Sequence, residues 1–293
     1  MTKKKLAYFQ LHFAVLLYGL TAILGDLISI SAINLVWWRV LITSISLLFF
    51  IELGKQILKM DKRLVLIYAG IGVIVAVHWI TFYGAIKYSN ASIVLATMAT
   101  TSLFTALIEP LVTKKKFSKL EFVLGLLVIP PMVLIAKNID LDLQKGIWIG
   151  LISAFLASLF ASLNKKYVEK ASSYQITFIE MFSAFLFISI VLPFVLTDIN
   201  QLMPSPTDWI YLIILSLLCT TLAYVISMKA LKHVSAFDAN LVVNLEPVYG
   251  ILLAIVILNE HHEMSLTFYL GVLMIMLVVF SHPILQKYSN GRK

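Results

Sequence analysis

Apolar residues run along this chain in long blocks, and short polar segments separate the blocks. A helix needs about 20 apolar residues to cross the hydrocarbon core of a bilayer. Ten blocks reach that length, and no segment between them is long enough to fold as a domain. The blocks are residues 6–24, 33–53, 64–83, 90–112, 119–138, 147–168, 173–196, 208–229, 236–258 and 265–284. The pattern therefore predicts an all-α membrane protein with ten transmembrane helices.

Composition agrees with this interpretation. Of the 293 residues, 60% are hydrophobic and 13% are charged, whereas soluble domains have about 25% charged residues. The basic and then apolar N-terminus resembles a signal peptide, but no clear small-residue cleavage site follows, so we interpret it as the first membrane helix. The single cysteine, Cys219, lies in an apolar block and excludes an intramolecular disulfide.

The net charge of +8 would fit a nucleic-acid-binding protein, but the positions of the basic residues exclude that class. Nineteen of the 23 Lys and Arg residues fall in alternate segments between the predicted helices, and three fall in the remaining segments. Lys and Arg are enriched on the cytoplasmic side of membrane proteins. The asymmetry predicts that both the N-terminus and the C-terminus are cytoplasmic.

The chain contains an internal repeat. AIKYSNA at 85–91 matches ALKHVSA at 230–236, and LEFVLGLLVI at 120–129 matches LTFYLGVLMI at 266–275. The two separations are 145 and 146 residues, which is half of the chain. We therefore divide the chain into repeats 1–140 and 141–293, each with five helices. Because five is odd, the second repeat enters the membrane from the opposite side, an inverted arrangement that is typical of transporters.

With these halves defined, the chain resembles the drug/metabolite transporter superfamily, and within it the EamA-type ten-helix permeases. The resemblance covers essentially the whole chain and rests on Trp37-Trp38-Arg39, the two repeated junctions, Leu245-Glu246-Pro247, Gly125 and Gly271. It implies a central cavity lined by the first, third, fourth, sixth, eighth and ninth spans. It also implies alternating access, and often the export of amino acids or related metabolites. The first half departs from the second, because Thr101-Ser102 stands where the second half has Glu246-Pro247.

The ninth span has a charge and a helix breaker near its centre. Within 240–258, NLVVNLEPVYGILLAIVIL, the exceptional residues are Asn240, Asn244, Glu246 and Pro247. Proline removes a helical hydrogen bond, and a carboxyl in hydrocarbon is costly. Both features are tolerated beside a polar cavity, so we interpret Glu246 as a proton-coupling or substrate-contacting group. The alternative is a structural kink with a neutral Glu246.

The three polar side chains of this span do not share one face of a regular helix. Asn240 and Asn244 lie about 40° apart, whereas Glu246 lies about 160° from Asn244. We therefore expect either the two asparagines or the glutamate to face the cavity, and the sequence does not choose between them.

Other polar residues within predicted helices are candidates for the cavity. His78 either relays protons or binds a carboxylate, or it packs between helices, and Trp79 either stacks on a ligand or anchors the helix at the interface. Arg39 either attracts anions or, as we expect, extends outward to the membrane surface or bonds to helix ends. Glu180 occupies the matching place in the second half and is expected to be structural. Further cavity candidates are Tyr18, Thr101, Asn164 and Tyr224, and weaker ones are His12, Thr97 and Thr220.

Motifs for nucleotide binding, hydrolysis and metal-dependent proteolysis are absent from the sequence, so no cofactor, no metal site and no enzyme activity are predicted. His261-His262-Glu263 is interpreted as a solvated loop. We expect a multi-pass protein of the cell membrane, with the bilayer and a small-molecule substrate as its partners. The sequence leaves open whether the protein forms a homodimer.

The leading hypothesis is a secondary transporter that exports small metabolites, and the sequence leaves open whether this transport is coupled to protons. The alternatives are a multidrug efflux permease and, with less support, a membrane enzyme or lipid-handling protein.

Overall fold

A computed structural model describes residues 2–137, 141–196, 198–243, 245–258 and 265–290, and these residues form helices without any β-strand. The α-helices are α1 (Lys3–Leu27), α2 (Ala32–Leu47), α3 (Lys62–Tyr88), α4 (Ala91–Met98), α5 (Thr101–Thr113), α6 (Lys119–Leu126), α7 (Ile129–Lys137), α8 (Leu141–Tyr167), α9 (Ser173–Val195), α10 (Pro206–Ser216), α11 (Ala223–Leu231), α12 (Ala236–Val243), α13 (Glu246–Ile257) and α14 (Leu266–Asn290). Short 3₁₀ segments occupy Leu48–Phe50, Val168–Lys170 and Ile199–Leu202, and π-helical segments occupy Leu53–Ile57 and Leu217–Leu222.

Eight helical stretches among the described residues are long and apolar enough to cross a membrane. They are Lys3–Leu27, Ala32–Phe50, Lys62–Tyr88, Ala91–Thr113, Leu143–Lys170, Ser173–Val195, Pro206–Leu231 and Ala236–Ile257. These stretches correspond to predicted spans one to four and six to nine. The predicted fifth span is divided between α6 and α7, and in the tenth only Leu266–Val278 is apolar enough to be a shorter candidate. An all-helical membrane protein is therefore confirmed, whereas the number ten stays a prediction.

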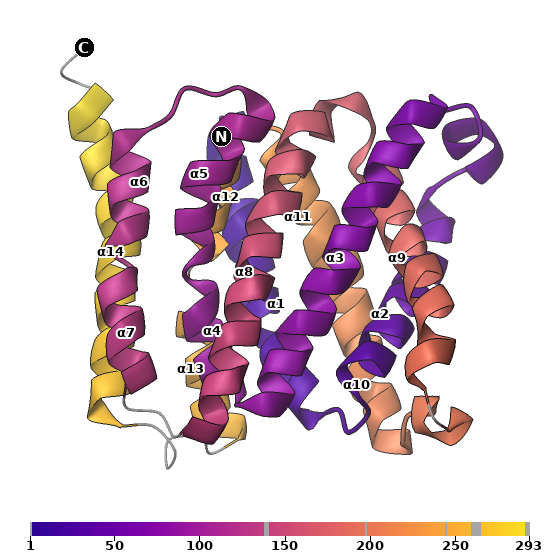
Figure 1. Ribbon diagram of the computed structural model, residues 1–293. Helices are drawn as coiled ribbons and strands as arrows, with labels where there is room; N and C mark the ends of the chain where they lie inside the picture. The colour runs from indigo at the N-terminus through magenta and orange to yellow at the C-terminus, as the bar shows by residue number, and fades with distance from the viewer. Residues whose placement is uncertain (1, 138–140, 197, 244, 259–264, 291–293) are drawn as a thin grey trace.

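The helices stand side by side, and both ends of the chain lie at the same end of the bundle (Figure 1). The helix pairs with the most extensive contacts join the two halves of the chain: α3 packs on α8 and α9, α5 on α8, α1 on α11 and α13, and α2 on α9. At one edge, α6 and α7 pack against α14. The centre of the bundle is thus built by both repeats together.

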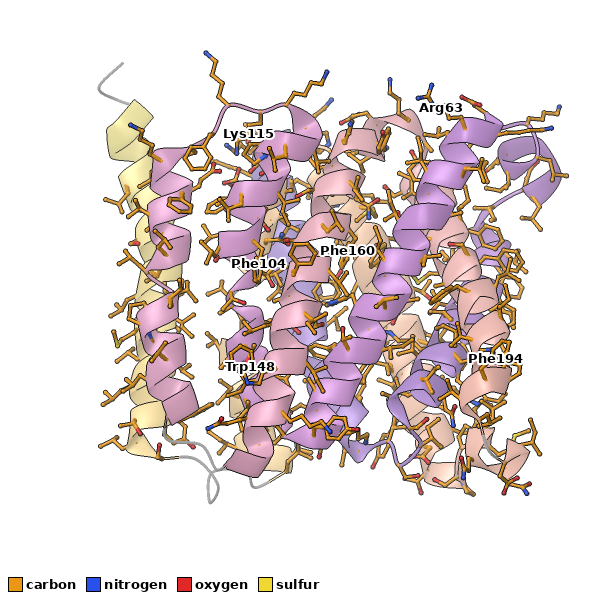
Figure 2. All side chains as sticks on the ribbon, in the orientation of Figure 1. Arg63, Phe104, Lys115, Trp148, Phe160 and Phe194 are labelled. Atoms are coloured by element: carbon orange, nitrogen blue, oxygen red, sulfur yellow. The ribbon has the colours of Figure 1, made fainter. Side chains whose placement is uncertain are left out.

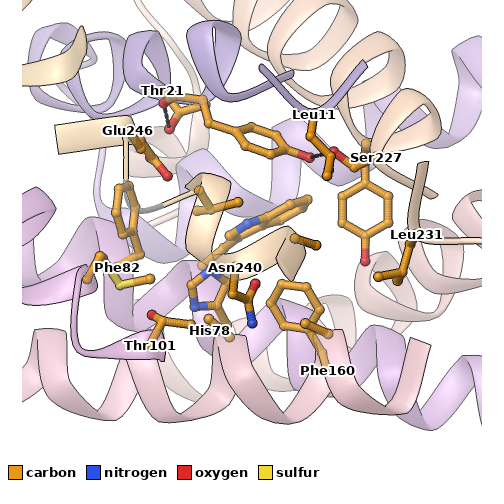
Figure 3. A pocket seen from close by; sticks show the side chains of 18 of the residues that line it. Leu11, Thr21, His78, Phe82, Thr101, Phe160, Ser227, Leu231, Asn240 and Glu246 are labelled. Carbon is orange, nitrogen blue, oxygen red and sulfur yellow. Dashed lines mark hydrogen bonds between the residues drawn. The ribbon is translucent and has the colours of Figure 1, made fainter. Parts of the chain in front are cut away.

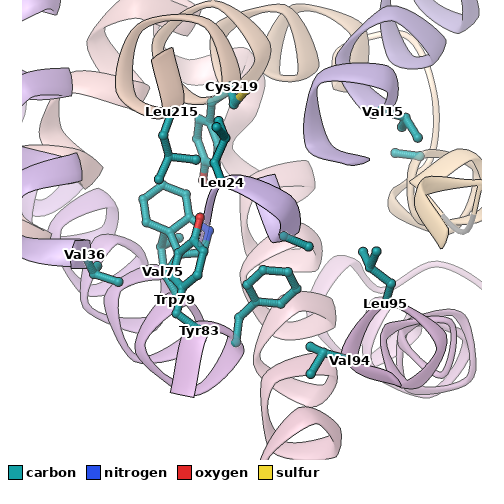
Figure 4. Close-up of a cluster of buried hydrophobic side chains, with 14 of the residues drawn as sticks. Val15, Leu24, Val36, Val75, Trp79, Tyr83, Val94, Leu95, Leu215 and Cys219 are labelled. Carbon is teal, nitrogen blue, oxygen red and sulfur yellow. The ribbon is translucent and has the colours of Figure 1, made fainter. Parts of the chain in front are cut away.

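The surface and the interior both match a bilayer environment. Phe194 is 87% exposed on the outside of the bundle, whereas Arg63 and Lys115 lie at the end where the termini lie (Figure 2). Such exposed aromatic side chains are unfavourable in water and favourable in lipid. Inside, Trp79 and Tyr83 pack near Leu215 and Cys219 in the apolar core, where Cys219 is a buried free thiol (Figure 4).

The fourth and ninth spans are each interrupted at the same place. α4 ends at Met98 and α5 begins at Thr101, while α12 ends at Val243 and α13 begins at Glu246. Both boundaries are 145 residues apart in the sequence, the spacing of the first repeated motif. The departure of the first half from the Glu-Pro pattern therefore does not change its backbone, because both halves place a break at this position.

Pro247 lies in the first turn of α13. A residue in the first turn of a helix has no intrahelical acceptor for its N–H, so proline is tolerated there. The first half makes its break with Ala99 and Thr100, and Thr100 N–H bonds to the Thr97 carbonyl at 3.1 Å. One of the two breaks therefore forms without a proline.

Gly72 sets the close approach of α3 to α9. A Cβ on Gly72 would overlap the carbonyl oxygen of Glu180 and Oγ of Ser183, and would lie 2.7 Å from Glu180 Cα. We expect Gly72→Ala to lower the free energy of unfolding by about 1–3 kcal/mol, because the added methyl group forces the helices apart. The measurement is thermal unfolding of the purified protein in detergent.

Gly70 on the same helix supplies the matched control. A Cβ there meets nothing within 4 Å, so Gly70→Ala is expected to leave stability unchanged or to raise it by up to about 1 kcal/mol through helix propensity. Equal effects of the two substitutions would contradict the close α3–α9 approach.

Candidate functional site

A cavity of about 130 Å³ lies in the centre of the bundle (Figure 3). Its wall comes from α1, α2, α3, α4, α5, α8, α11, α12 and α13. These helices form the first, third, fourth, sixth, eighth and ninth predicted spans, as the resemblance implies, together with α2 of the second span. The polar or charged side chains in the wall are Tyr18, Thr21, Arg39, His78, Trp79, Thr101, Tyr224, Ser227, Asn240 and Glu246.

Arg39 extends into the cavity wall. Its side chain is 3% exposed, its Nε donates to Thr220 Oγ1 at 2.7 Å, and its Nη1 donates to the Tyr83 hydroxyl at 2.6 Å. The guanidinium carbon lies 3.7 Å from the centre of the Trp79 ring, a cation–π contact that contributes about 2 kcal/mol when desolvated. The expectation that Arg39 extends outward is therefore wrong, because partners inside the bundle hold it.

The guanidinium of Arg39 keeps unused hydrogen-bonding capacity. Two of its five N–H groups donate to Thr220 and Tyr83. In the described part of the chain, no carboxylate lies within ion-pair distance of it, and the ion pairs there are those of Lys115 with Glu109 and Glu121. A buried guanidinium without a carboxylate partner suits the recognition of an anionic ligand group.

Asn240 and Glu246 both line the cavity (Figure 3). On one continuous helix their side chains would point about 120° apart. Because the helix breaks between them, both face the same space, and the choice we expected between asparagine and glutamate does not arise for this pair. Asn244 lies outside the described residues.

The Glu246 carboxyl is free to meet a ligand. Asn240 Nδ2 donates to Thr105 Oγ1 at 2.8 Å, which fixes its amide against α5. The Glu246 side chain is 8% exposed, and among the described residues no hydrogen bond or ion pair holds its carboxyl. Glu246 and Arg39 thus bring a carboxyl and a guanidinium from the two halves into one cavity without being paired to each other.

Thr101 and Glu246 occupy equivalent places in the two repeats. Each is the first residue of the second half-helix, and each lines the cavity. Thr101 Oγ1 is buried without a hydrogen-bond partner among the described residues. Since helix N-termini carry unsatisfied N–H groups, two such ends meeting at the cavity make its centre polar.

His78 and Trp79 lie side by side in the wall on α3. His78 Nδ1 lies 2.9 Å from both the backbone oxygen and Oγ of Ser153, so α8 holds the ring in place. Trp79 is 7% exposed and packs edge-on against Tyr224 with ring centres 6.3 Å apart. The expectation that Trp79 anchors the helix at the membrane interface is wrong, because its ring stacks under Arg39 inside the bundle.

Tyr18 and Tyr224 carry hydroxyl groups into the wall from α1 and α11. The Tyr18 hydroxyl and Ser227 Oγ are hydrogen-bonded at 2.9 Å. Tyr224 donates to Glu180 Oε2 at 2.6 Å. Asn164 does not line the cavity, but its Nδ2 lies 3.3 Å from the Tyr224 hydroxyl.

The weaker candidates have other places. His12 is exposed, Thr97 packs against Gly150, and Thr220 accepts a hydrogen bond from Arg39. His261-His262-Glu263 lies outside the described residues, and the described part holds no cluster of three or more His, Cys, Asp or Glu that fits a metal ion. Sequence reasoning missed Ser227 and Phe160, although Ser227 lies three residues after Tyr224 on one helix face.

At one end of the bundle, contacts between the two halves lie beyond the cavity. Glu109 on α5 accepts from the N–H groups of Ala236 and Phe237 at 2.8 and 2.9 Å and so caps α12. Lys115 lies 2.8 Å from Glu121 and 3.6 Å from Glu109. Burial lowers the pKa of Lys115, but the hydrogen bond to Glu121 and the charges of Glu109 and Glu121 outweigh it, so the pKa is raised and Lys115 stays charged.

At the other end, Asp208 on α10 accepts from the Ser29 N–H at 2.8 Å and from Ser29 Oγ at 2.6 Å. Asn34 Nδ2 donates to the Gln201 carbonyl at 2.7 Å. Hydrogen bonds therefore join the two halves of the chain at both ends of the bundle.

Comparisons with known proteins agree with this architecture. A crystal structure of a protein superposes on this chain with a TM-score of 0.73 at 12% identity, covering 96% of this chain and 98% of that chain, which shows a shared fold. No curated protein matches the chain. The model of the EamA-like transporter family matches residues 5–136 and again residues 144–281. With one match in each half, the chain belongs to the EamA-like transporter family, part of the drug/metabolite transporter superfamily.

Proposed function

We propose that this membrane transporter carries small zwitterionic metabolites, such as amino acids or related compounds, by alternating access through the central cavity. The observation that carries the proposal is that the guanidinium of Arg39 and the carboxyl of Glu246 line the same cavity, and that no ion pair among the described residues holds either of them. A zwitterion supplies the missing partner for each of them.

Arg39 would bind the substrate carboxylate. Its free N–H groups match the two oxygens of a carboxylate in geometry, and the surrounding low dielectric strengthens the contact. The bonds to Thr220 and Tyr83 and the stacking on Trp79 hold the guanidinium before a ligand arrives. Little side-chain entropy is then lost on binding.

Glu246 would bind the substrate ammonium group from α13. In the absence of substrate, the same carboxyl can take a proton, so substrate and proton compete for one group. Such competition makes the substrate affinity depend on pH, since a protonated carboxyl does not balance the charge of the ammonium group.

A multidrug efflux permease is the second candidate, and the aromatic wall favours it. Rings of Tyr18, Trp79, Phe82, Phe160 and Tyr224 line the cavity. The volume argues for the smaller substrate, because about 130 Å³ is well below the roughly 300–1,000 Å³ of sites for drug-sized ligands. The proposal therefore keeps small metabolites as the substrate class.

The proposal includes a topology of ten spans in inverted repeats 1–140 and 141–293, with both termini cytoplasmic, in the cell membrane. The charge asymmetry supports it, as does the location of Arg63 and Lys115 at the end of the bundle where both termini lie (Figure 2). Export is the direction that the family resemblance implies. Whether the chain forms a homodimer is measured by the mass of the purified protein.

Cysteine labelling tests the topology. In a Cys219→Ser background, Lys59→Cys, Lys116→Cys and Lys287→Cys are expected to resist an impermeant thiol reagent in intact cells and to react after the membrane is opened. Reaction of all three positions from outside would contradict the ten-span arrangement.

Transport by the purified protein in proteoliposomes tests the function. Radiolabelled amino acids and related zwitterions are expected to cross the membrane, whereas their decarboxylated amines and their amides are not. The assay is run in both directions, with and without a pH gradient. Transport of bulky hydrophobic cations without transport of any zwitterion would replace the proposal by multidrug efflux.

A further inference from the structure

A second carboxyl lies behind the cavity wall and is connected to it through Tyr224. The Glu180 side chain on α9 is 0% exposed and does not line the cavity. The Tyr224 hydroxyl donates to Glu180 Oε2 at 2.6 Å, while the Tyr224 side chain lines the cavity. Asn164 Nδ2 lies 3.4 Å from the same carboxyl oxygen and 3.3 Å from the Tyr224 hydroxyl. These three side chains form a closed polar cluster.

Two oxygen atoms of this cluster have no hydrogen-bond partner in the described part of the chain. Glu180 Oε1 and Asn164 Oδ1 are both buried without a hydrogen bond among the described residues. Buried polar atoms are nearly always hydrogen-bonded, so an unpartnered pair on two touching side chains calls for an explanation. If Glu180 Oε1 carries a proton, this oxygen becomes a hydrogen-bond donor. Asn164 Oδ1 is an acceptor without a donor among the described residues.

Among the described residues, no positive charge balances Glu180. The titratable groups that face it are Tyr68 on α3 and Tyr224 on α11. On the other helices packed around it, Arg39 of α2 is held by Tyr83 and Thr220, and Lys165 of α8 donates to the Leu231 carbonyl. A carboxylate buried without a counter-charge is strongly unfavourable, so this environment selects the protonated acid.

We propose that Glu180, Asn164 and Tyr224 form a proton-binding site that is occluded in this conformation and is separate from Glu246. A sodium ion fits the cluster less well. Transporters coordinate sodium largely with carbonyl groups of unwound helices, whereas α8 and α9 run without a break. A single proton on Glu180 Oε1 removes the buried negative charge and gives this unpartnered oxygen a hydrogen to donate, without any further ligand.

Tyr224 provides the route between this site and the cavity. When Tyr224 turns away, water from the cavity reaches the carboxyl, the O–H bond of Glu180 breaks, and the proton passes to that water. The carboxylate that remains accepts hydrogen bonds from water and from the Asn164 amide. Coupling of this step to substrate movement rests on the proposed function, whereas proton binding by Glu180 does not.

A matched pair of tyrosines makes the site testable. Tyr83 bonds to Arg39 and Tyr224 bonds to Glu180, and each bond spans 44 residues of sequence. Tyr83→Phe and Tyr224→Phe thus remove the same hydroxyl from two similar helix contacts, only one of which includes Glu180.

Infrared spectroscopy of the purified protein measures protonated carboxyl groups without any substrate. We expect Glu180→Gln to remove one component of the protonated-carboxyl band, Tyr224→Phe to shift that component, and Tyr83→Phe to leave it unchanged. An unaltered band in Glu180→Gln over the whole pH range overturns the proposal. If Glu180→Gln does not fold, an unaltered band in Tyr224→Phe overturns it equally. An ionised carboxyl band at Glu180 that depends on sodium concentration assigns the site to sodium instead.

Transport tests the coupling separately. One proton moved down a gradient of one pH unit supports about tenfold accumulation of substrate. We expect Glu180→Gln to lose this accumulation while substrate affinity stays within about twofold of the parent. Accumulation equal to that of the parent overturns the coupling role. If the parent carries no zwitterion at all, the proposed function fails while the infrared result still decides the proton site.

Discussion

Replacing Arg39 by glutamine is expected to weaken the binding of carboxylate-bearing substrates roughly 100-fold, about 3 kcal/mol. The guanidinium has no carboxylate partner among the described residues, so a substrate carboxylate would be its principal counter-charge. Glutamine keeps some hydrogen bonding but no charge, and a carboxylate entering the desolvated cavity would then remain unpaired. The measurement is substrate affinity from proteoliposome transport, with thermal unfolding as the test of folding.

Two further variants separate charge from structure. Arg39→Lys keeps the charge but loses the planar fork and the stacking on Trp79, so we expect an intermediate loss of roughly tenfold. Arg63→Gln makes the same chemical change at an exposed position in the first turn of α3, and it is expected to leave the substrate affinity unchanged. Parent-like affinity in Arg39→Gln would show that the carboxylate binds elsewhere.

The sequence predicts much of this fold because the bilayer imposes simple rules. Length and hydropathy locate the spans, and the AIKYSNA and ALKHVSA motifs reveal the repeat. The break at Ala99 and Thr100 is not visible in the same way, since neither residue is a helix breaker. It becomes apparent only when the first half is compared with the second, where Glu246 and Pro247 mark the equivalent place.

The candidate site is predicted less completely, because the sequence does not show which neighbouring residue will form hydrogen bonds with a polar side chain in a membrane helix. Arg39 was expected at the membrane surface, yet Thr220 and Tyr83, which are far from it in sequence, hold it inside. On a regular helix, Asn240 and Glu246 would point in different directions. The break between α12 and α13 lets both side chains face the cavity. In both cases, contacts between the halves decide the orientation, and helical periodicity carries no information about them.

Glu246 and Glu180 illustrate two different uses of a buried carboxyl. Glu246 lines the cavity and has no side-chain partner among the described residues, so its carboxyl is available to a ligand. Glu180 is enclosed by Tyr224 and Asn164 and meets no ligand directly. The two proposals therefore predict different losses: substrate affinity for Glu246 and proton-driven accumulation for Glu180.

Glu246→Gln is expected to weaken the binding of zwitterionic substrates by roughly 30-fold, about 2 kcal/mol. Glutamine has nearly the same shape, but it cannot balance the substrate ammonium charge. In the parent, protons compete with the ammonium group for the carboxyl, so affinity falls as the pH is lowered. The variant has no group to protonate, and its affinity is expected to be weak and independent of pH. The measurement is substrate affinity as a function of pH.

The controls for Glu246 use both the substrate and the protein. A substrate analogue without the ammonium group is expected to bind the variant at least as well as the parent, because the repulsion between two carboxylates is removed. Glu169→Gln makes the same change at an exposed residue beyond α8 and is expected to preserve both affinity and its pH dependence. If Glu246→Gln binds zwitterions like the parent at every pH, Glu246 is a structural residue at the start of α13, and His78 is the next candidate for the ammonium or proton contact.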